Sequence, residues 1–261
     1  MNPGFEAEWR ARFDRFAARG GSEAQISGWS EHGMSRRIEA VMRAIDAFGP
    51  PPGRPFLDLG CGSGAYCLHL RERGFRTFGA DYSPGMLGRA LAVTRCVDGL
   101  APIPLVAADI LHLPFADARF DGLINVGVMQ HIARADQALG EIGRICAAGA
   151  LAYVDTLNAR SLQAFVLACA AYPRAWLKGR LRPRLHAIRR SAASLAALGA
   201  AAGFDTVEVR GIYVLPRPLR FLESLFDRLD RLRLPGSRTS LVHFMANTQL
   251  VVFRRRSSPA N

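Results

Sequence analysis

A glycine-rich turn that directly follows a short apolar strand constrains the fold of this chain more than any other feature. The strand reads Pro55-Phe-Leu-Asp-Leu59, and the turn reads Gly60-Cys-Gly-Ser-Gly64. Glycine adopts positive φ without steric cost and, because it lacks a Cβ, allows a ligand to approach the main chain. In open parallel sheets, ligands bind at the carboxyl ends of the strands. The turn therefore indicates a ligand site on a parallel α/β sheet.

Apolar strands and amphipathic helices alternate through the rest of the chain, as is typical of a parallel sheet covered on both faces. We expect further strands at 75–80, 103–107, 122–125, 151–156, 206–214 and 248–253. We expect helices near 65–73, 84–97, 135–146 and 191–202. The fold class is therefore α/β, with a Rossmann-like, doubly wound and mostly parallel seven-stranded sheet.

The segments around this sheet define the expected domain organisation. Residues 1–50 form an N-terminal helical segment with helices over 4–18 and 35–48, and residues 51–157 form the ligand-binding half. Residues 158–253 complete the sheet and carry two insertions, 158–190 and 215–246, which we expect to cap a substrate. Helical spacing of apolar residues predicts a helix in the second insertion, and residues 254–261 read as a disordered tail.

Two aspartates end the second and third strands. Asp81, in Gly79-Ala-Asp-Tyr-Ser-Pro-Gly-Met86, can accept hydrogen bonds from both hydroxyls of a ribose. Asp109, in Ala108-Asp-Ile110, can accept from an adenine amino group while Ile110 covers the ring. The alternative is that Asp81 caps the helix that Ser83-Pro84 opens, and that Asp109 only closes a turn.

The glycine turn, the Asp81 and Asp109 motifs and Phe120-Asp-Gly-Leu-Ile-Asn125 together resemble class I S-adenosylmethionine-dependent methyltransferases, especially those of quinone biosynthesis and their small-molecule relatives. The resemblance covers residues 35–157, and beyond them only the order of elements matches. A dinucleotide site would read Gly-x-Gly-x-x-Gly, whereas this turn reads Gly-x-Gly-x-Gly. The spacing argues against the alternative of an NAD(P)-dependent oxidoreductase. The resemblance implies S-adenosyl-L-methionine as the cofactor and implies nothing about the acceptor.

The resemblance also implies a set of cofactor contacts. Arg36 or Arg37 would pair with the cofactor carboxylate, although either could instead belong to a solvated helix face. Met86 would pack near the ribose, unless it serves only the core. The full set is Arg36, Arg37, Asp58, Gly60, Cys61, Gly62, Ser63, Asp81, Tyr82, Met86, Asp109, Ile110, Asn125 and Val126.

Candidates for catalysis and acceptor binding follow the fourth strand and lie in the insertions. His131 is the candidate general base, because its ordinary pKa of about 6.5 suits proton transfer; it could instead only hydrogen-bond the turn. Some quinone O-methyltransferases carry carboxylates around this histidine and bind a divalent cation. Here the segment reads Gly127-Val-Met-Gln-His131, so we expect no metal. Acceptor contacts, with core packing as the alternative, are expected from His32, Tyr172, Trp176, Tyr213 and Phe244.

The net charge of +12 is concentrated in the second part of the chain. This favours an anionic or lipid-like small acceptor, and the apolar and arginine-rich segment 165–190 suggests peripheral contact with a membrane. Solvated surface in an arginine-biased protein is the plain alternative. An RNA methyltransferase is a further alternative, but we do not expect nucleic acid as a partner, since the sequence shows neither an Asn/Asp-Pro-Pro-Tyr element nor an RNA-binding module.

The five scattered cysteines indicate reduced thiols in a cytoplasmic protein. The N-terminus lacks an apolar signal core, and the longest apolar run, 162–172, is too short to span a bilayer. We therefore expect a cytoplasmic protein, with peripheral contact at the inner face of the membrane as a variant of that expectation.

Overall fold

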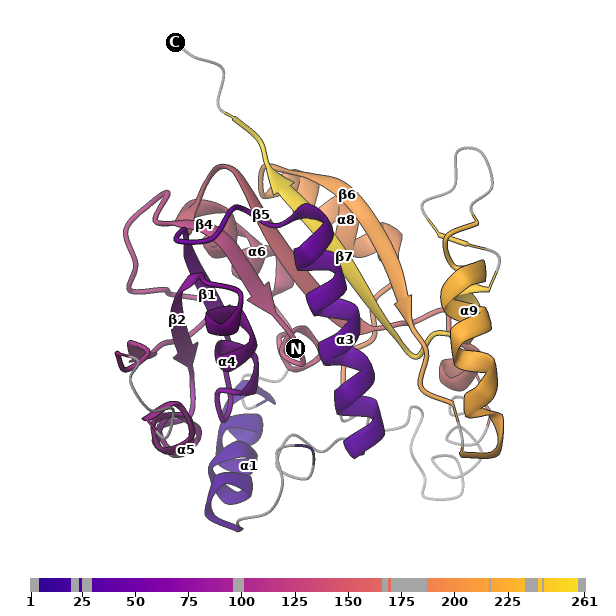
Figure 1. Cartoon of the computed structure of the whole chain (residues 1–261), viewed down its shortest axis with the longest axis horizontal. Helices are drawn as coiled ribbons and strands as arrows, with labels where there is room; N and C mark the ends of the chain where they lie inside the picture. The colour runs from indigo at the N-terminus through magenta and orange to yellow at the C-terminus, as the bar shows by residue number, and fades with distance from the viewer. Residues whose placement is uncertain are drawn as a thin grey trace.

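The computed structural model describes residues 5–19, 24, 30–95, 101–165, 169, 187–215, 217–232, 239–240 and 242–257. Its centre is a seven-stranded sheet in the order β3-β2-β1-β4-β5-β7-β6 (Figure 1). Strands β1 to β5 run parallel to one another, and β7 is antiparallel to both β5 and β6. The strands are β1 (Pro55–Leu59), β2 (Arg76–Asp81), β3 (Leu105–Ala107), β4 (Phe120–Asn125), β5 (Cys146–Leu157), β6 (Phe204–Ile212) and β7 (Thr248–Arg255). The predicted fold class is confirmed.

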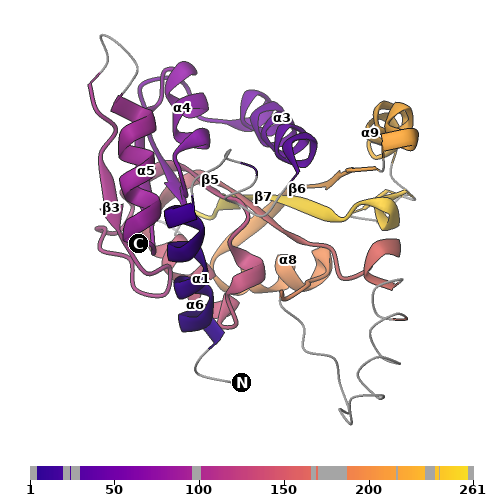
Figure 2. The ribbon, with the colours of Figure 1, turned by 90° about the horizontal axis from the view of Figure 1, so that it is seen from below.

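Helices cover both faces of the sheet (Figure 2). One face carries α3 (Glu31–Phe48), α4 (Ala65–Glu72) and α5 (Pro84–Arg95), and the other carries α6 (Ala135–Ile145) and α8 (Ala192–Ala201). Helix α3 begins four residues before the predicted start, because the Ser30 side chain accepts a hydrogen bond from the Gly33 N–H and caps it.

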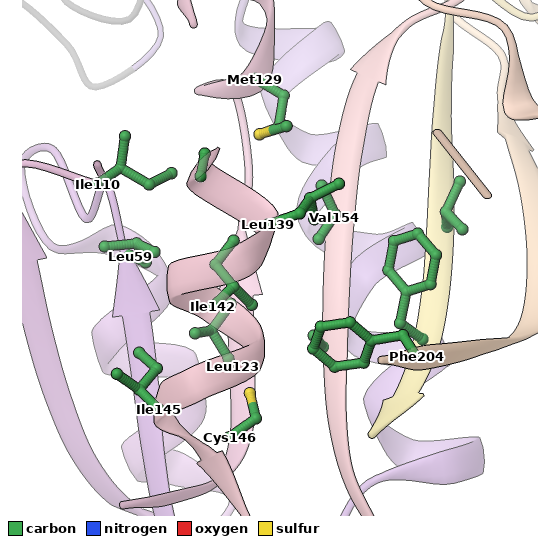
Figure 3. Packing of buried hydrophobic residues seen from close by; sticks show 14 of the residues in the cluster. Leu59, Ile110, Leu123, Met129, Leu139, Ile142, Ile145, Cys146, Val154 and Phe204 are labelled. Carbon is green, nitrogen blue, oxygen red and sulfur yellow. The ribbon is translucent and has the colours of Figure 1, made fainter. Parts of the chain in front are cut away.

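The largest core cluster lies between the sheet and α6 (Figure 3). Leu139, Ile142 and Ile145 recur at helical spacing on one face of α6 and pack against Leu59 and Leu123 of the central strands. All five side chains are buried. This packing fixes β1 and β4 side by side, and both strands end at the same edge of the sheet.

Helix α1 (Phe5–Arg19) lies across the carboxyl ends of the central strands (Figures 1 and 2). It contacts α5 and the short helix η1 (Met129–His131), which follows β4. The N-terminal helix is thus placed over the edge of the sheet where a ligand is expected.

The second predicted insertion contains η2 (Arg217–Leu222), α9 (Glu223–Leu229) and η3 (His243–Met245), so its predicted helix exists. It lies beside α3, outside the β6 edge, and not over the carboxyl ends of β1 and β2 (Figure 1). Its expected role as a cap over the substrate stays a prediction. Most of the first insertion, including 170–186, lies outside the described residues.

The predicted tail begins too early. Arg254 and Arg255 belong to β7, where they pair with Leu151 of β5 and Phe204 of β6, and the Arg256 N–H donates to the Gly203 carbonyl at 3.0 Å. Pairing with two neighbouring strands orders these residues despite their charge. Residues 258–261 lie outside the described part of the chain. Among the described residues, every helix is too short or too polar to cross a bilayer.

Candidate cofactor site

The glycine turn after β1 has the backbone that its sequence predicts. Gly60, Gly62 and Gly64 have φ values of 82°, 54° and 90°. A Cβ built on Gly60 would lie 2.2 Å from Cγ2 of Val128, so glycine is required there by both conformation and space. The N–H groups of Gly60 and Cys61 donate to the Ala80 carbonyl at 2.7 and 3.0 Å, which holds the turn against the end of β2.

Asp81 joins the turn to the second strand. One carboxylate oxygen accepts from the Gly62 N–H at 2.8 Å, and the other accepts from the Ser83 N–H at 2.8 Å. Burial raises the pKa of Asp81, and these main-chain donors act in the opposite direction. The carboxylate is thus held in a fixed position at the rim of the sheet.

Asp109 and Ile110 form the next part of the rim. The Asp109 carboxylate accepts from the Leu111 N–H at 2.9 Å, and an antiparallel bridge joins Asp109 to His112. Ile110 is buried, with an exposed fraction of 6%. The carboxylate therefore lies beside an apolar surface, as a site for a purine ring requires.

A cavity of about 180 Å³ brings these groups together. Its lining contains most of the residues expected to hold the cofactor: Arg37, Gly60, Cys61, Gly62, Ser63, Asp81, Tyr82, Met86, Asp109, Ile110 and Val126, with the candidate base His131. The clustering follows from topology, because the carboxyl ends of β1, β2, β3 and β4 meet at one edge of the sheet.

Asp58 and Asn125 lie beneath the cavity and are absent from its described lining. Asp58 is buried in β1, where the Cys67 thiol donates to its carboxylate at 3.3 Å, and burial raises its pKa to about 7. The Asn125 amide donates to the Leu59 carbonyl at 2.8 Å and joins the ends of β1 and β4. In this structure Asp58 joins β1 to α4, and Asn125 joins the ends of β1 and β4.

The two adjacent arginines of α3 contact different parts of the molecule. The Arg37 guanidinium is buried and faces the cavity, 3.6 Å from the Asp155 carboxylate, and it donates to the Thr248 hydroxyl at 2.5 Å. Arg36 points away, where it donates to both oxygens of Asp227 at 2.8 Å. Of the two expected cofactor ligands, only Arg37 is placed to reach a ligand in the cavity.

Helix α1 covers the cavity, which the sequence did not lead us to expect. Trp9 and Phe13 line it, and their rings lie 3.8 and 5.3 Å from the His131 ring between centroids. The Arg89 guanidinium donates to the Ala17 carbonyl at 3.0 Å, and the Ser83 hydroxyl donates to Asp14. The helical spacing of Phe5, Trp9, Phe13 and Phe16 signals an apolar face but not the surface that it covers.

Enclosure changes the chemistry of His131. Burial, with a smaller effect of the Arg12 guanidinium, lowers the pKa of His131 to about 3. Its imidazole is therefore neutral throughout the physiological range. Its buried Nδ1 has no hydrogen-bond partner among the described residues.

The three expected acceptor residues that the structure describes do not line this cavity. His32 lies 2.9 Å from the Glu223 carboxylate, and the Tyr213 hydroxyl donates to Asp230 at 2.7 Å, so both serve the contact with α9. Phe244 lies in η3 with an exposed fraction of 50%. Tyr172 and Trp176 lie outside the described residues. No group of three or more potential metal ligands occurs in the described part of the chain.

A sheet in this order, with a glycine turn after β1 and a carboxylate ending β2, defines the class of Rossmann-like proteins that bind a nucleoside cofactor. A family model described as a methyltransferase domain matches residues 57–154. The 2-phytyl-1,4-naphtoquinone methyltransferase of Trichormus variabilis is 30% identical over 161 residues, which cover 60% of this chain and 68% of that protein. The chain belongs to the S-adenosylmethionine-dependent methyltransferase family.

Other comparisons agree with this assignment. The ubiquinone biosynthesis O-methyltransferase of Mesorhizobium japonicum is 31% identical over 167 residues, 57% of this chain and 66% of that protein. The magnesium protoporphyrin IX methyltransferase of Synechocystis shares the fold, with a TM-score of 0.63, 17% identity and coverage of 97% and 96% of the two chains. The chain spans about half the length of several curated relatives that it matches. The predicted family and cofactor are thus confirmed.

Proposed function

We propose that this protein transfers the methyl group of S-adenosylmethionine to a small, flat and largely apolar acceptor of the quinone-precursor type. One observation carries the proposal: a single cavity joins the cofactor rim of Gly60, Asp81 and Asp109 to an aromatic cover made by Trp9 and Phe13. Similarity to enzymes named for quinone methylation supports the acceptor class.

The residues present fit the cofactor. Gly60 and Gly62 have positive φ, and we assign the cradle that they form to the methionine part of the cofactor. In this proposal Asp81 accepts from the ribose hydroxyls, and Asp109 with Ile110 binds the adenine. We assign the buried guanidinium of Arg37 to the cofactor carboxylate, which a guanidinium binds well. When bound, the cofactor supplies a methyl group on a sulfonium, which an acceptor attacks in line.

The protein's own contribution would be alignment and exclusion of water. Trp9, Phe13, Met34 and Ile132 offer an apolar wall against which a flat ring can lie. Holding two reactants in attack geometry corresponds to effective molarities of about 10⁵ M and above. Closure of α1 over the cavity would keep water from competing with the acceptor.

We assign His131 to proton acceptance from an acceptor hydroxyl or amine. Its neutral imidazole lines the cavity below α1. Because its pKa is about 3 while α1 is closed, it is a weak base. It would therefore take the proton as the new bond to the methyl group makes the acceptor atom more acidic. O-methylation and N-methylation both require removal of this proton. In C-methylation of an activated ring, a proton leaves the ring carbon after the methyl group has been transferred.

An acceptor carrying a long apolar chain would bring the enzyme to the inner face of a membrane in the cytoplasm. The expected contact through 165–190 falls mostly outside the described residues and stays a prediction.

Methylation of RNA is the alternative function, and it would use the basic C-terminal half of the chain to bind the nucleic acid.

Calorimetry with S-adenosylmethionine and with NADH tests the cofactor half of the proposal. We expect Asp81→Asn to weaken S-adenosylmethionine binding by about 10- to 100-fold, because hydrogen bonds to a charged group contribute roughly 1.5–3 kcal/mol. Asp205→Asn is the matched control, since the Asp205 side chain is 71% exposed and lies on β6 away from the cavity. No heat from the unaltered protein would refute the proposal.

Transfer of labelled methyl groups to catechols, hydroquinones, porphyrin carboxylates and structured RNA tests the acceptor half. We expect label in a flat aromatic class and a 10²- to 10⁴-fold lower kcat in His131→Asn, the range for loss of general base catalysis. Label confined to RNA would overturn the acceptor class. An unchanged kcat with a raised KM in His131→Asn would limit His131 to acceptor packing.

A further inference from the structure

The segment η2–α9 segregates its charges. All three acidic residues of 217–232 face inward: Glu223 accepts from the Leu215 N–H at 2.7 Å and lies against His32, Asp227 binds Arg36, and Asp230 accepts from Tyr213, Ser240 and Gly211. Glu223 and Asp227 are thus paired with the Arg36 guanidinium, at 3.5 and 2.8 Å, and Asp230 is held by uncharged hydrogen-bond donors. None of the three reaches the outward face of the segment.

The outward face combines apolar and cationic side chains. Phe221, Leu225 and Leu232 have exposed fractions of 74%, 46% and 67%, and Leu219 has 45%. Arg220, Arg228 and Arg231 are exposed between them, and none of the three forms an ion pair with another described residue. We name this set, Leu219, Arg220, Phe221, Leu225, Arg228, Arg231 and Leu232, the α9 face.

More large apolar side chains are exposed in the segments next to the α9 face. Phe244 of η3 is 50% exposed, and Leu162 and Phe165 are 45% and 66% exposed. The Asn158 amide donates to the carbonyls of His243 and Ala246, and the Ser240 hydroxyl donates to Asp230, which ties these segments to the end of α9. They lie on the same side of the molecule as α9 (Figure 2).

We propose that the α9 face docks the protein on a bilayer that contains anionic lipid. Interfacial amphipathic segments combine inserted Leu and Phe side chains with arginines at the level of the headgroups. Arginine close to an anionic leaflet gains a favourable interaction with the negative surface potential. This surface carries both features and no outward carboxylate that would oppose them.

The chemistry of the face favours lipid over nucleic acid. Single-stranded nucleic acid binds where aromatic rings offer stacking platforms beside cations. Here three of the four apolar side chains are leucines, which neither stack on bases nor hydrogen-bond to them, and Phe221 is the single exposed ring of the face. Charge complementarity together with aliphatic insertion commits the proposal to a bilayer.

Docking through the α9 face would set the orientation of the cavity. Arg36 and His32 of α3 hold α9 through Asp227 and Glu223, and α3 also supplies Met34 and Arg37 to the cavity lining. One helix therefore connects the docking surface with the cofactor site. The inference goes beyond the proposed methyl transfer, because binding to vesicles requires no catalysis.

Flotation of the full chain with vesicles tests the inference. The probes are phosphatidylcholine vesicles with and without phosphatidylglycerol, at low and physiological ionic strength. We expect retention on the anionic vesicles only, weakened by salt. Arg220→Gln/Arg228→Gln should lower the partition coefficient roughly 30-fold, since each arginine near the surface accounts for about 1 kcal/mol of binding free energy.

Two further variants complete the design. Arg76→Gln/Arg95→Gln removes the same charge from exposed arginines elsewhere and should bind like the unaltered chain. Phe221→Ser/Leu225→Ser keeps the charge and should also weaken binding, while circular dichroism and S-adenosylmethionine affinity stay unchanged for all variants. Equal weakening by both arginine pairs, retention on neutral vesicles or no retention at all would overturn the proposal. If the unaltered chain bound structured RNA and not vesicles, and Arg220→Gln/Arg228→Gln lost that RNA binding, the face would be reassigned to nucleic acid.

Discussion

An added methyl group has opposite expected effects at two glycines of the cofactor-binding half. Gly60 has a φ of 82° and lies against Val128, whereas Gly88 lies inside α5 with no atom within 4 Å of a built Cβ. An L-residue in left-handed conformation costs roughly 1–2 kcal/mol, and replacing glycine by alanine inside a helix gains about 0.5–1 kcal/mol. The difference between these sites separates a required glycine from a tolerated one.

We therefore expect Gly60→Ala to lower the free energy of unfolding by at least about 2 kcal/mol and to weaken S-adenosylmethionine binding. Gly88→Ala should leave the affinity unchanged and raise the stability slightly. Urea denaturation and calorimetry measure both. Equal effects of the two substitutions would show that the turn does not depend on its glycine conformation.

At the scale of elements, α3 and α1 connect the cofactor site with the rest of the molecule. Neighbouring residues of a helix point about 100° apart, so Arg37 can face the cavity while Arg36 holds α9. Helix α1 covers the cavity with Trp9 and Phe13. Of these two elements, α1 has the smaller contact with the sheet.

The docking of α1 should depend on pH through His131. Its pKa is about 3 beneath α1, against about 6.5 for an uncovered imidazole, so the covered state binds fewer protons. The docked state is therefore fully favoured above pH 6.5 and loses up to about tenfold in its equilibrium constant per pH unit as the pH falls from 6.5 toward 3. Protonation of His131 and closure of α1 compete.

Fluorescence of Trp9, in a chain carrying Trp29→Phe and Trp176→Phe, measures this equilibrium. We expect a shift toward the solvent-exposed spectrum between pH 6.5 and 4. His131→Asn in the same background should remove that shift, because asparagine does not titrate. A shift of the same size in both chains would assign the pH dependence to another group.

At the scale of the whole molecule, the sheet could be predicted from the sequence, and the position of α1 over the cavity could not. The residues of 55–157 carry their own signals: apolar strands, a glycine turn and aspartates at strand ends, whose meeting at one edge follows from parallel topology. The position of α1 depends on packing between segments far apart in the chain. An amphipathic pattern such as that of Trp9 and Phe13 does not specify the surface against which the helix packs. Nor does the sequence of the pair Arg36 and Arg37 show which of the two side chains faces the cavity.

Packing between distant segments also explains why Tyr213, expected to bind the acceptor, has another role in the structure. Tyr213 is an aromatic residue at the end of a strand, which is a plausible position for a pocket by sequence. Its hydroxyl instead donates to Asp230, which also accepts from Ser240 and Gly211. Burial acts to raise the pKa of Asp230, but His243, followed by these three donors, lowers it to about 2. Such a network forms only when three distant segments meet, so no local pattern announces it.

Ligand-induced stabilisation tests the whole assembly of cavity, rim and cover. A ligand that binds only the folded state at 100 times its Kd stabilises it by about 2.7 kcal/mol. For a chain of this size roughly 2–4 °C accompany each kcal/mol, so S-adenosylmethionine should raise Tm by about 5–10 °C. NADH should leave Tm unchanged, because the turn has the spacing Gly-x-Gly-x-Gly and not that of a dinucleotide site. The rise should shrink in Asp81→Asn and persist in Asp205→Asn, whose side chain lies away from the cavity. A comparable rise with NADH would mean that the rim selects for adenosine alone, and that the methionine half of the site has been assigned wrongly.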